Sequence, residues 1–337
     1  MRAHEVVASL LVGLGAGCVP AREHFGPMPV RNQHPAQLTV LHMAPAEAAV
    51  LPAGGIELRA DAAYSSLFLL GSGNGKSWLM DGEYLRASTR ARAGLGRDLE
   101  LALELPFAHT SGGFLDGFLI DYHELFGFPD QNRDVNPQDD FAVEARRSGS
   151  TVWQVERDGF EWLDVPVVAT WSALASRPNR PGLALRGGLE LPTGDQDRGY
   201  GNGEVDASFG ALADWRSDSV ALFAHAQHTF AGTPAPARRQ GLTFADVTSL
   251  GLAAELPLLE DVHAFAQVEW ENSTLRNFGL PVSDRDQVVL WIGGRWQVDT
   301  NTGIEVGFGE DLLGKASPDF TAWLGFVWTP GARPVGR

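Results

Sequence analysis

The sequence predicts an all-β protein, a closed antiparallel β-barrel that spans a membrane with about twelve strands (range 10–14). The first observation is a series of segments of about ten residues in which apolar and polar side chains alternate. Residues 84–95 show this best, because leucine and alanine fall on one face while Arg86, Arg90 and Arg92 fall on the other. The second observation is that short turns and long glycine-rich loops join these segments in alternation. Lipid on one side and a polar interior on the other produce this pattern.

The third observation concerns helices. No apolar run after the first 20 residues reaches the roughly 18 residues that a membrane-spanning helix needs. A closed barrel is the other way to cross a bilayer, because it pairs every backbone donor internally. Arg2, the apolar stretch 6–16 and the small residues before Ala21 predict a signal peptide over 1–21, and therefore export to a bacterial outer membrane. Residues 14–18 alternatively resemble a lipoprotein signal, which would lipidate Cys18.

Period-two alternation places the predicted strands and gives them one orientation. They cover residues 54–66, 82–95, 97–108, 161–174, 182–192, 203–215, 218–230, 246–256, 261–271, 286–298, 301–310 and 318–328. The short connections 96–98, 216–217 and 299–302 are expected on the periplasmic side. The long connections 67–81, 192–203, 231–244 and 272–285 are expected outside. Residues 141–147 with 151–157 offer a further hairpin, which would make fourteen strands.

The outward positions support a wall that faces lipid. The alternate residues 262–270 and 320–328 carry no charge, and a charge at mid-bilayer costs roughly 2 to 4 kcal/mol. Trp171, Trp215, Trp270 and Trp328 lie at strand ends, where interfacial aromatic belts occur. A soluble two-sheet sandwich has the same alternation and is the alternative. Outer-membrane lipid and the barrel-assembly machinery are the expected partners. The net charge of −16 and the lack of a basic stripe argue against nucleic acid.

Three segments lie outside the simple strand pattern of the barrel, which covers 54–328. Residues 22–53 precede the first strand and form either a periplasmic plug that enters the barrel or a linker. The insertion 109–160 carries apolar residues at helical spacing over 114–126, among them Phe118, which predicts an extracellular amphipathic helix. A loop of this length with structure of its own is often functional. Residues 329–337 form a C-terminal tail.

The predicted inward face is rich in charge. If the turn 96–98 pairs Leu95 with Leu99, Arg90 falls opposite Glu104 and Arg92 lies diagonal to two glutamates. One interpretation is that Arg86, Arg90, Arg92, Glu100 and Glu104 form a charge ladder that selects polar solutes, with His109 and Phe118 near the constriction. The other is that these charges neutralise one another and brace a narrow lumen. Replacing Arg90 and Arg92 by alanine then tests the ladder through ion selectivity.

Four stretches carry a resemblance to a known family. They are 26–35 (GPMPVRNQHP), 81–83 (DGE), 109–116 (HTSGGFLD) and 191–195 (LPTGD). On them the chain, from about residue 25 to 328, resembles a bacterial family known only as a domain of unknown function. The resemblance implies an exported β protein of the outer-membrane type and supplies no activity. Barrel-assembly machinery usually reads a terminal aromatic residue, and this chain continues for nine residues beyond Trp328.

Two constellations offer chemistry. His109 and Ser111 resemble the histidine-x-serine pair of outer-membrane lipid A deacylases, in which the imidazole takes the proton from a serine nucleophile. A histidine in a loop beside a Ser-Gly-Gly turn is the plainer interpretation. The other constellation is a set of possible metal ligands, Asp116, Asp121, His123 and Glu124, which as exposed helix residues are more simply solvated. The glycine- and aspartate-rich stretch 192–203 lacks phosphate-loop spacing and needs no ligand. No cofactor or metal is expected.

These patterns lead to a passive channel or a binding barrel for a small polar solute. Two alternatives remain open at this point. One is an outer-membrane lipid or ester hydrolase that uses Ser111 and His109. The other is a structural outer-membrane protein without transport activity.

Overall fold

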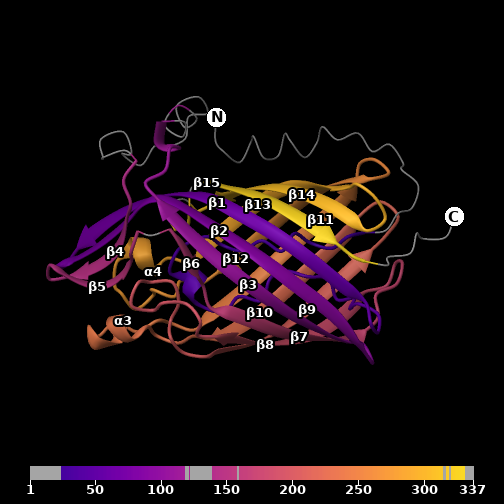
Figure 1. The fold of residues 1–337 in the computed structure, drawn as a ribbon, viewed down its shortest axis with the longest axis horizontal. Coiled ribbons are helices and arrows are strands. Elements are labelled where there is room, and N and C mark those ends of the chain that lie inside the picture. The colour runs from indigo at the N-terminus through magenta and orange to yellow at the C-terminus, as the bar shows by residue number, and fades with distance from the viewer. Residues whose placement is uncertain are drawn as a thin grey trace.

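The fold is a closed barrel of twelve antiparallel strands (Figure 1). It is seen in a computed structural model that describes residues 24–117, 121, 139–157, 159–313, 316–318 and 320–330. The barrel strands are β1 (Ile56–Gly73), β2 (Lys76–Gly96), β3 (Leu99–Ser111), β7 (Val165–Leu174), β8 (Gly182–Leu191), β9 (Asp206–Arg216), β10 (Ala221–Phe230), β11 (Val247–Pro257), β12 (Val262–Glu271), β13 (Gln287–Gln297), β14 (Thr302–Asp311) and β15 (Phe320–Trp328).

Each barrel strand pairs with the next barrel strand along the chain, and the pairing of the last strand with the first completes the ring. β3 pairs with β7, and β15 pairs with β1 from Phe320 opposite Ser66 to Trp328 opposite Leu58. Because the sheet closes on itself, its backbone groups are paired around the whole circumference. The prediction of a closed antiparallel barrel is therefore confirmed, and the sandwich alternative is wrong.

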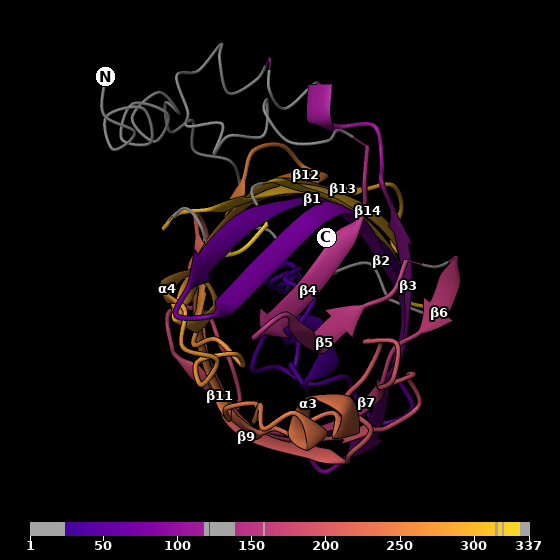
Figure 2. The same ribbon diagram turned by 90° about the vertical axis from the view of Figure 1, so that its left-hand side faces the viewer.

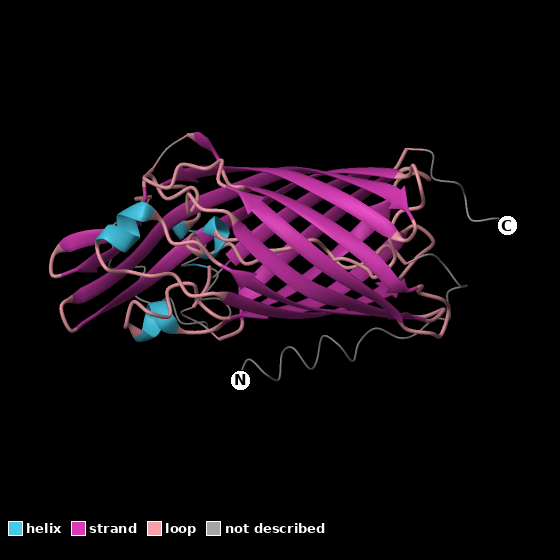
Figure 3. Cartoon of the chain, turned by 90° about the horizontal axis from the view of Figure 1, so that it is seen from below, coloured by secondary structure: helices cyan, strands magenta, loops and turns pink. Residues whose placement is uncertain are grey.

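The two ends of the barrel differ. We call one the turn end, because it holds the short connections 97–98, 175–181, 217–220, 258–261 and 298–301. We call the other the loop end. It carries β4 (Ala142–Arg147), β5 (Ser150–Val155), β6 (Phe160–Trp162), α3 (Ala235–Arg239) and α4 (Pro281–Asp284) (Figure 3). None of the helices in the described ranges is long and apolar enough to cross a membrane.

The first hairpin differs from the prediction. Residues 67–81 were expected to be a long loop, but β1 and β2 stay paired up to Gly73 opposite Lys76. Asn74 and Gly75 turn the chain with φ of 51° and 72°, the left-handed conformation that two-residue hairpin turns require. The hairpin therefore projects beyond the rest of the barrel at the loop end, and an Asn-Gly pair in the sequence was the signal for it.

The additional hairpin exists but is not part of the ring. β4 pairs with β5 and with the projecting part of β2, from Lys76 to Asp81. β6 pairs with residues 107–109 of β3, so that the predicted strand 161–174 is divided into β6 and β7. The barrel keeps twelve strands. Most of the predicted helix 114–126, including Phe118, lies outside the described residues, as do the predicted signal peptide with Cys18 and most of the tail.

Burial alternates along the strands as the sequence predicted. In β15 the side chains of Leu324, Phe326 and Trp328 are exposed, whereas those of Trp323 and Val327 are buried. Large exposed apolar side chains recur around the wall; on β3, β8, β11 and β13 they are Leu99, Leu101, Leu103, Leu105, Leu183, Leu185, Leu189, Leu191, Leu250, Leu252, Ile292 and Trp296. The outer wall is thus an apolar belt of the kind that marks a contact with lipid or protein.

Candidate functional site

The N-terminal segment, residues 24–53, runs inside the barrel. Figure 2 shows it in indigo within the ring of strands, seen from the loop end. It has an ascending leg (24–33), a tip (34–40) and a descending leg (41–53) that leads into β1 at the turn end. Nearly all of residues 26–43 are buried, although the only regular element among them is the short 3-10 turn η1 (Gln37–Thr39).

The ascending leg is held through its backbone. The N–H groups of Phe25 and Gly26 donate to the carboxylate of Glu255 at 3.0 and 3.2 Å. The Met28 carbonyl accepts a hydrogen bond of 3.2 Å from the Gln267 side chain. These contacts replace the pairing that a strand would supply, which is why an irregular segment can lie buried.

The tip closes on itself and on the wall. The Arg31 guanidinium donates to the carbonyls of Gln37 and Val40. The Gln37 side chain then donates to the Asn272 carbonyl (3.1 Å) and accepts from the Thr274 N–H (2.7 Å). Gln37 thereby joins the tip to the loop that follows β12.

The descending leg is held by polar side chains of the wall. Its backbone N–H groups donate from Leu41 to Asp206 (3.0 Å), from Met43 to Gln227 (3.1 Å), from Ala48 to Asp214 (2.9 Å) and from Leu51 to Glu100 (2.9 Å). These acceptors lie on three strands of the barrel, β3, β9 and β10, while the ascending leg is held by β11 and β12. The segment is therefore attached around the lumen and not to one side of it.

An apolar core fills the lumen at the loop end. The tip contributes Ala36, Leu38 and Val40 to it, and the barrel and its loops contribute Leu67, Leu69, Trp78, Met80, Tyr84, Trp153, Tyr200, Leu242, Phe244, Leu275 and Phe278. The His34 ring stacks on Trp78 with centroids 5.5 Å apart, and Trp78 stacks on Trp153 at 6.0 Å. Burial lowers the pKa of His34 to about 4, so this imidazole is neutral at ordinary pH.

The other half of the lumen carries the charge ladder. Arg90 lies opposite Glu104 in the register of β2 and β3, as the sequence predicted, and donates to it through Nε at 2.8 Å. Arg86 also pairs with Glu104. Arg92 bridges Glu100 (2.8 Å) and Glu57 (3.0 Å). Gly96, rather than Leu95, lies opposite Leu99, because a bulge interrupts the ladder next to the turn.

Ion pairs also join the last strands to the first across the closure of the barrel. Glu305 on β14 binds both Arg59 of β1 and Arg295 of β13. Arg186 of β8 differs from these arginines, because its guanidinium donates to the Ala44 carbonyl of the descending leg (2.9 Å) and forms no ion pair with a described carboxylate. The sequence could not predict the contacts of Arg59 and Arg186, since they link residues far apart in the chain, whereas Arg295 and Glu305 lie opposite each other across the short turn between β13 and β14.

A cavity lies between the two legs and the wall, within this charged half. The centre of a water-sized sphere fits within about 60 Å³ of it, which is room for a few water molecules. Its charged lining residues are Glu47, Glu57, Arg59, Arg90, Arg92, Glu100, Glu104 and Arg186, four of each sign. Sequence reasoning missed Glu47, which the descending leg brings into the lumen. Four of the five predicted ladder residues line this cavity, and Arg86 lies next to it through Glu104.

The predicted hydrolase pair lies elsewhere. His109 and Ser111 share the outward face of β3 with Leu101 and Leu103, so His109 does not lie at a constriction of the lumen. The His109 ring stacks on Phe160 at 5.2 Å, and no hydrogen bond joins it to Ser111. Among the described residues no carboxylate pairs with His109. The arrangement thus lacks the contact that would activate a serine nucleophile.

The stretches 81–83 and 109–116, which carry part of the family resemblance, pack against each other in the structure. The Glu83 carboxylate accepts the N–H groups of Phe114 (2.7 Å) and Leu115 (2.5 Å). Gly113, at φ of 82°, passes so close to Glu83 that a Cβ would lie 1.8 Å from its carboxyl carbon. Asp116 accepts from the Asp139 N–H at 2.9 Å. Asp116 therefore helps to fix the ends of the insertion, while His123 and Glu124 lie outside the described residues.

The stretch 192–203 is likewise organised without a ligand. The Asp164 carboxylate, in the connection before β7, accepts the N–H groups of Gly194 (2.8 Å) and Asn202 (3.0 Å). Burial raises the pKa of Asp164 to about 6. Asp195 accepts from the N–H of Asp197 within its own turn. The carboxylates of Asp164 and Asp195 thus hold the backbone of this loop.

Comparisons with known proteins agree with the fold. A family model described as "Protein of unknown function (DUF3187)" matches residues 6–329. No curated protein matches the chain. Among solved structures, the COG4313 outer membrane channel from Pseudomonas putida F1 is similar with a TM-score of 0.54 and 11% identity, over 86% of this chain and 100% of that chain.

Two further structures are less similar. The KdgM porin in complex with disordered oligogalacturonate gives a TM-score of 0.41 at 10% identity, over 81% of this chain and 98% of that chain. The translocator domain of the autotransporter NalP from Neisseria meningitidis gives 0.41 at 10% identity, over 81% and 88%. At these identities the likeness to the channel from Pseudomonas putida shows the barrel fold alone.

Proposed function

Because the chain belongs to the family described as proteins of unknown function (DUF3187) and folds as a closed twelve-stranded barrel, we propose that it is an outer-membrane channel for small polar solutes, closed by its own N-terminal segment. The observation that carries this proposal is the charge-lined cavity between that segment and the wall, which has room for a few water molecules. Outer-membrane lipid would surround the barrel, and the barrel-assembly machinery would insert it.

The outer wall supports the location. From Leu85 to Leu95 on β2 and from Leu99 to Leu105 on β3, every second residue faces outward and none of these is charged. Exposure of such a belt to water is unfavourable, whereas its contact with the hydrocarbon of lipid is not. The short turns and long loops at opposite ends match the periplasmic and external sides of outer-membrane barrels, respectively.

The cavity supports a polar solute. Arginine and glutamate side chains of the wall form charge-assisted hydrogen bonds, which are short and directional. A solute with both charged and hydrogen-bonding groups could exchange for these partners as it passes. The charges balance within the cavity, so we expect modest selectivity between cations and anions in the unaltered protein.

The ladder can be tested by substitution. Replacing Arg90 and Arg92 together by glutamine leaves Glu57 and Glu100 without their cationic partner and Glu104 with Arg86 alone, so the pore should shift toward cations by several-fold in permeability ratio. The measurement is the reversal potential in planar bilayers under a salt gradient, on protein whose folding is verified by a shift between boiled and unboiled gel samples. Glu104→Gln should move the reversal potential in the opposite direction.

A matched control changes the same net charge outside the lumen. Arg97 and Arg157 are exposed, and replacing both by glutamine should leave the reversal potential unchanged. If the Arg90 and Arg92 variant conducts with the selectivity of the unaltered protein, the cavity is not the pathway. If no folded form conducts under any condition, the channel proposal fails. The apolar core at the loop end would then favour a structural outer-membrane protein.

A further inference from the structure

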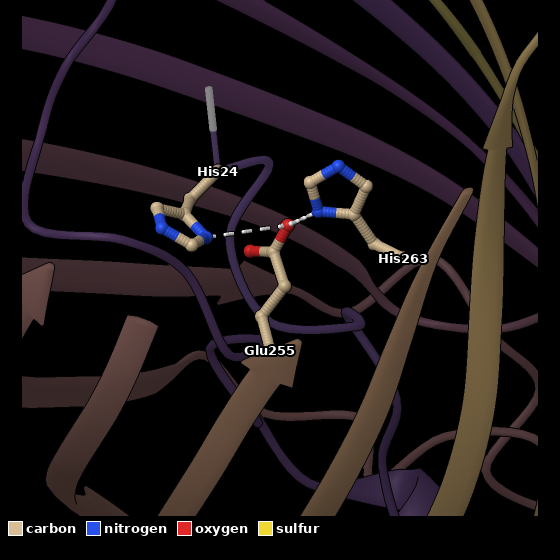
Figure 4. A group of neighbouring side chains, drawn as sticks. All are labelled: His24, Glu255 and His263. Atoms are coloured by element: carbon tan, nitrogen blue, oxygen red, sulfur yellow. Dashed lines mark hydrogen bonds and ion pairs between the residues drawn. The ribbon is translucent and has the colours of Figure 1, made fainter. Parts of the chain in front are cut away.

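Two histidines and a glutamate meet where the N-terminal segment enters the barrel. His24 lies at the start of the ascending leg, Glu255 on β11 and His263 on β12, and Figure 4 shows the three side chains turned toward one another. Their side-chain exposures are 4%, 0% and 0%. The cluster is separate from the charge ladder and uses none of its residues.

The ligand atoms are close enough to share one ion. Nδ1 of His263 lies 2.6 Å from Oε1 of Glu255, and Nδ1 of His24 lies 3.8 Å from the same oxygen. All three ligand atoms lie within 4.8 Å of one another. In a tetrahedral zinc site with bonds of about 2.0 to 2.2 Å, neighbouring ligand atoms are roughly 3.3 Å apart. The observed separations of 2.6 and 3.8 Å lie on either side of that value, so small side-chain shifts would bring the ligand atoms to the spacing of a zinc site.

The hydrogen bonding of His24 leaves its Nδ1 available. Nε2 of His24 donates to the Ser217 carbonyl at 2.8 Å, which places the proton of the neutral ring on that nitrogen. Nδ1 is buried and has no hydrogen-bond partner. It lies 3.8 Å from an oxygen of the Glu255 carboxylate, and a cation between these two atoms would give both of them a partner. Metal-binding histidines commonly donate their second nitrogen to a carbonyl in the same way.

The carboxylate of Glu255 is also oriented for this role. The N–H groups of Phe25 and Gly26 hold it in place, at 3.0 and 3.2 Å. The nearby Arg295 binds Glu305 and the Phe25 carbonyl, so its charge is compensated by another carboxylate. Glu255 forms no ion pair with Arg295, so its carboxylate faces the two histidines and these backbone N–H groups.

We propose that His24, Glu255 and His263 bind a divalent transition metal ion, with Zn²⁺ as the best match. Two imidazole nitrogens and one carboxylate oxygen suit zinc, whereas calcium and magnesium prefer oxygen alone. Water would complete the coordination. The ion would displace the hydrogen bond between His263 and Glu255, and the His263 ring would carry its proton on Nε2, which has no partner. Metal-binding histidines usually donate a hydrogen bond from their second ring nitrogen. We expect the lack of such a bond at Nε2 of His263 to weaken binding of the ion about 10- to 100-fold.

The bound ion would pin the entry point of the N-terminal segment. One ligand comes from the segment and two come from adjacent wall strands, so the ion would hold residue 24 against β11 and β12. An ion that binds only this arrangement also stabilises it by mass action. This inference does not depend on transport, because a structural barrel would be pinned in the same way.

The test is titration of the tag-free, chelator-treated and folded full chain with Zn²⁺ in a calorimeter, and with Co²⁺ followed by its visible absorbance. We expect one ion per chain and a tetrahedral Co²⁺ spectrum. His24→Ala, Glu255→Gln and His263→Ala should each weaken binding at least tenfold. His228→Ala is the matched control, since His228 lies on the outward face of β10 beside Phe209 and Phe230.

Folding of each variant is verified by the boiled and unboiled gel. His24→Ala is the most secure variant, because it changes no residue of the wall. A full chain that binds no Zn²⁺, or that binds it equally well in His24→Ala and His263→Ala, would overturn the proposal. Weakening of binding in His228→Ala to the same degree would also overturn it.

Discussion

The loop-end half of the lumen is apolar and the turn-end half is charged, although one continuous segment runs through both. The tip buries Leu38 and Val40 among aromatic side chains of the wall and loops. The legs instead lie beside arginines and glutamates, with a cavity between them. Apolar packing favours a single closed arrangement, whereas exchangeable polar contacts tolerate water and solutes. If the barrel is the proposed channel, its closure and its selectivity therefore reside in different parts of the same segment.

The largest effect is expected from a charge placed in the tip. Leu38→Asp puts a carboxylate into the apolar core without a partner, at a cost of about 4 kcal/mol or more. The tip should leave its site, and hydrogen exchange of the amides of residues 34–40 should accelerate on the order of a thousandfold. The barrel itself should remain folded.

The matching change in a leg should have little effect. Ala44→Asp adds the same charge next to the charged cavity, where Arg186 already donates to the Ala44 carbonyl and can pair with the new carboxylate. The rate of amide hydrogen exchange in residues 34–40 should remain close to that of the unaltered protein. Equal acceleration in Leu38→Asp and Ala44→Asp would remove the distinction between the two halves.

An intermediate effect is expected from acid. The pKa of His34 in the tip is about 4, below its ordinary 6.5, because burial disfavours the imidazolium more strongly than Glu271 attracts it. Insertion of the tip is therefore fully stabilised above about pH 6.5 and weakens as the pH falls toward 4, by roughly 3 kcal/mol in total. Open probability in planar bilayers should rise between pH 7 and 4.5.

His34→Gln provides the control for the acid effect, since glutamine does not titrate. Its open probability should vary much less over the same pH range. An identical pH response in this variant would mean that another group controls the tip.

The smallest effect is expected at the border between the halves. The Thr229 hydroxyl donates to the Leu41 carbonyl at 2.9 Å, where the descending leg leaves the tip. Thr229→Val removes this hydrogen bond at a cost of about 1 kcal/mol. Exchange at residues 38–43 should accelerate about fivefold, with no change in reversal potential. A change confined to selectivity would contradict the assignment of this contact to closure.

The wall of the barrel could be predicted from the sequence because its signal is local. Alternation shows which residues face outward, and the short turn between β2 and β3 fixes Arg90 opposite Glu104. The extension of the first hairpin was missed because apolar residues fill both faces there, where the loop-end core covers it. Asn74-Gly75 was the available signal.

The lumen could be predicted only in part. The stretch 26–35 was noticed, but its path depends on contacts with residues more than 200 positions away, such as Glu255 and Gln267. Glu255 lies in phase with Ser249 and Ala253 on the inward face of β11, so alternation alone could have identified it as a lumen residue. His24 carries no local pattern that points to the cluster at the entry.

The most direct test of closure by the tip is a paired planar-bilayer recording of the unaltered protein and Leu38→Asp, inserted at equal amounts of folded barrel. We predict rare, brief openings for the unaltered protein and sustained conductance for Leu38→Asp. Sustained conductance in both, or none in either, would contradict the account that the tip of the N-terminal segment closes this barrel.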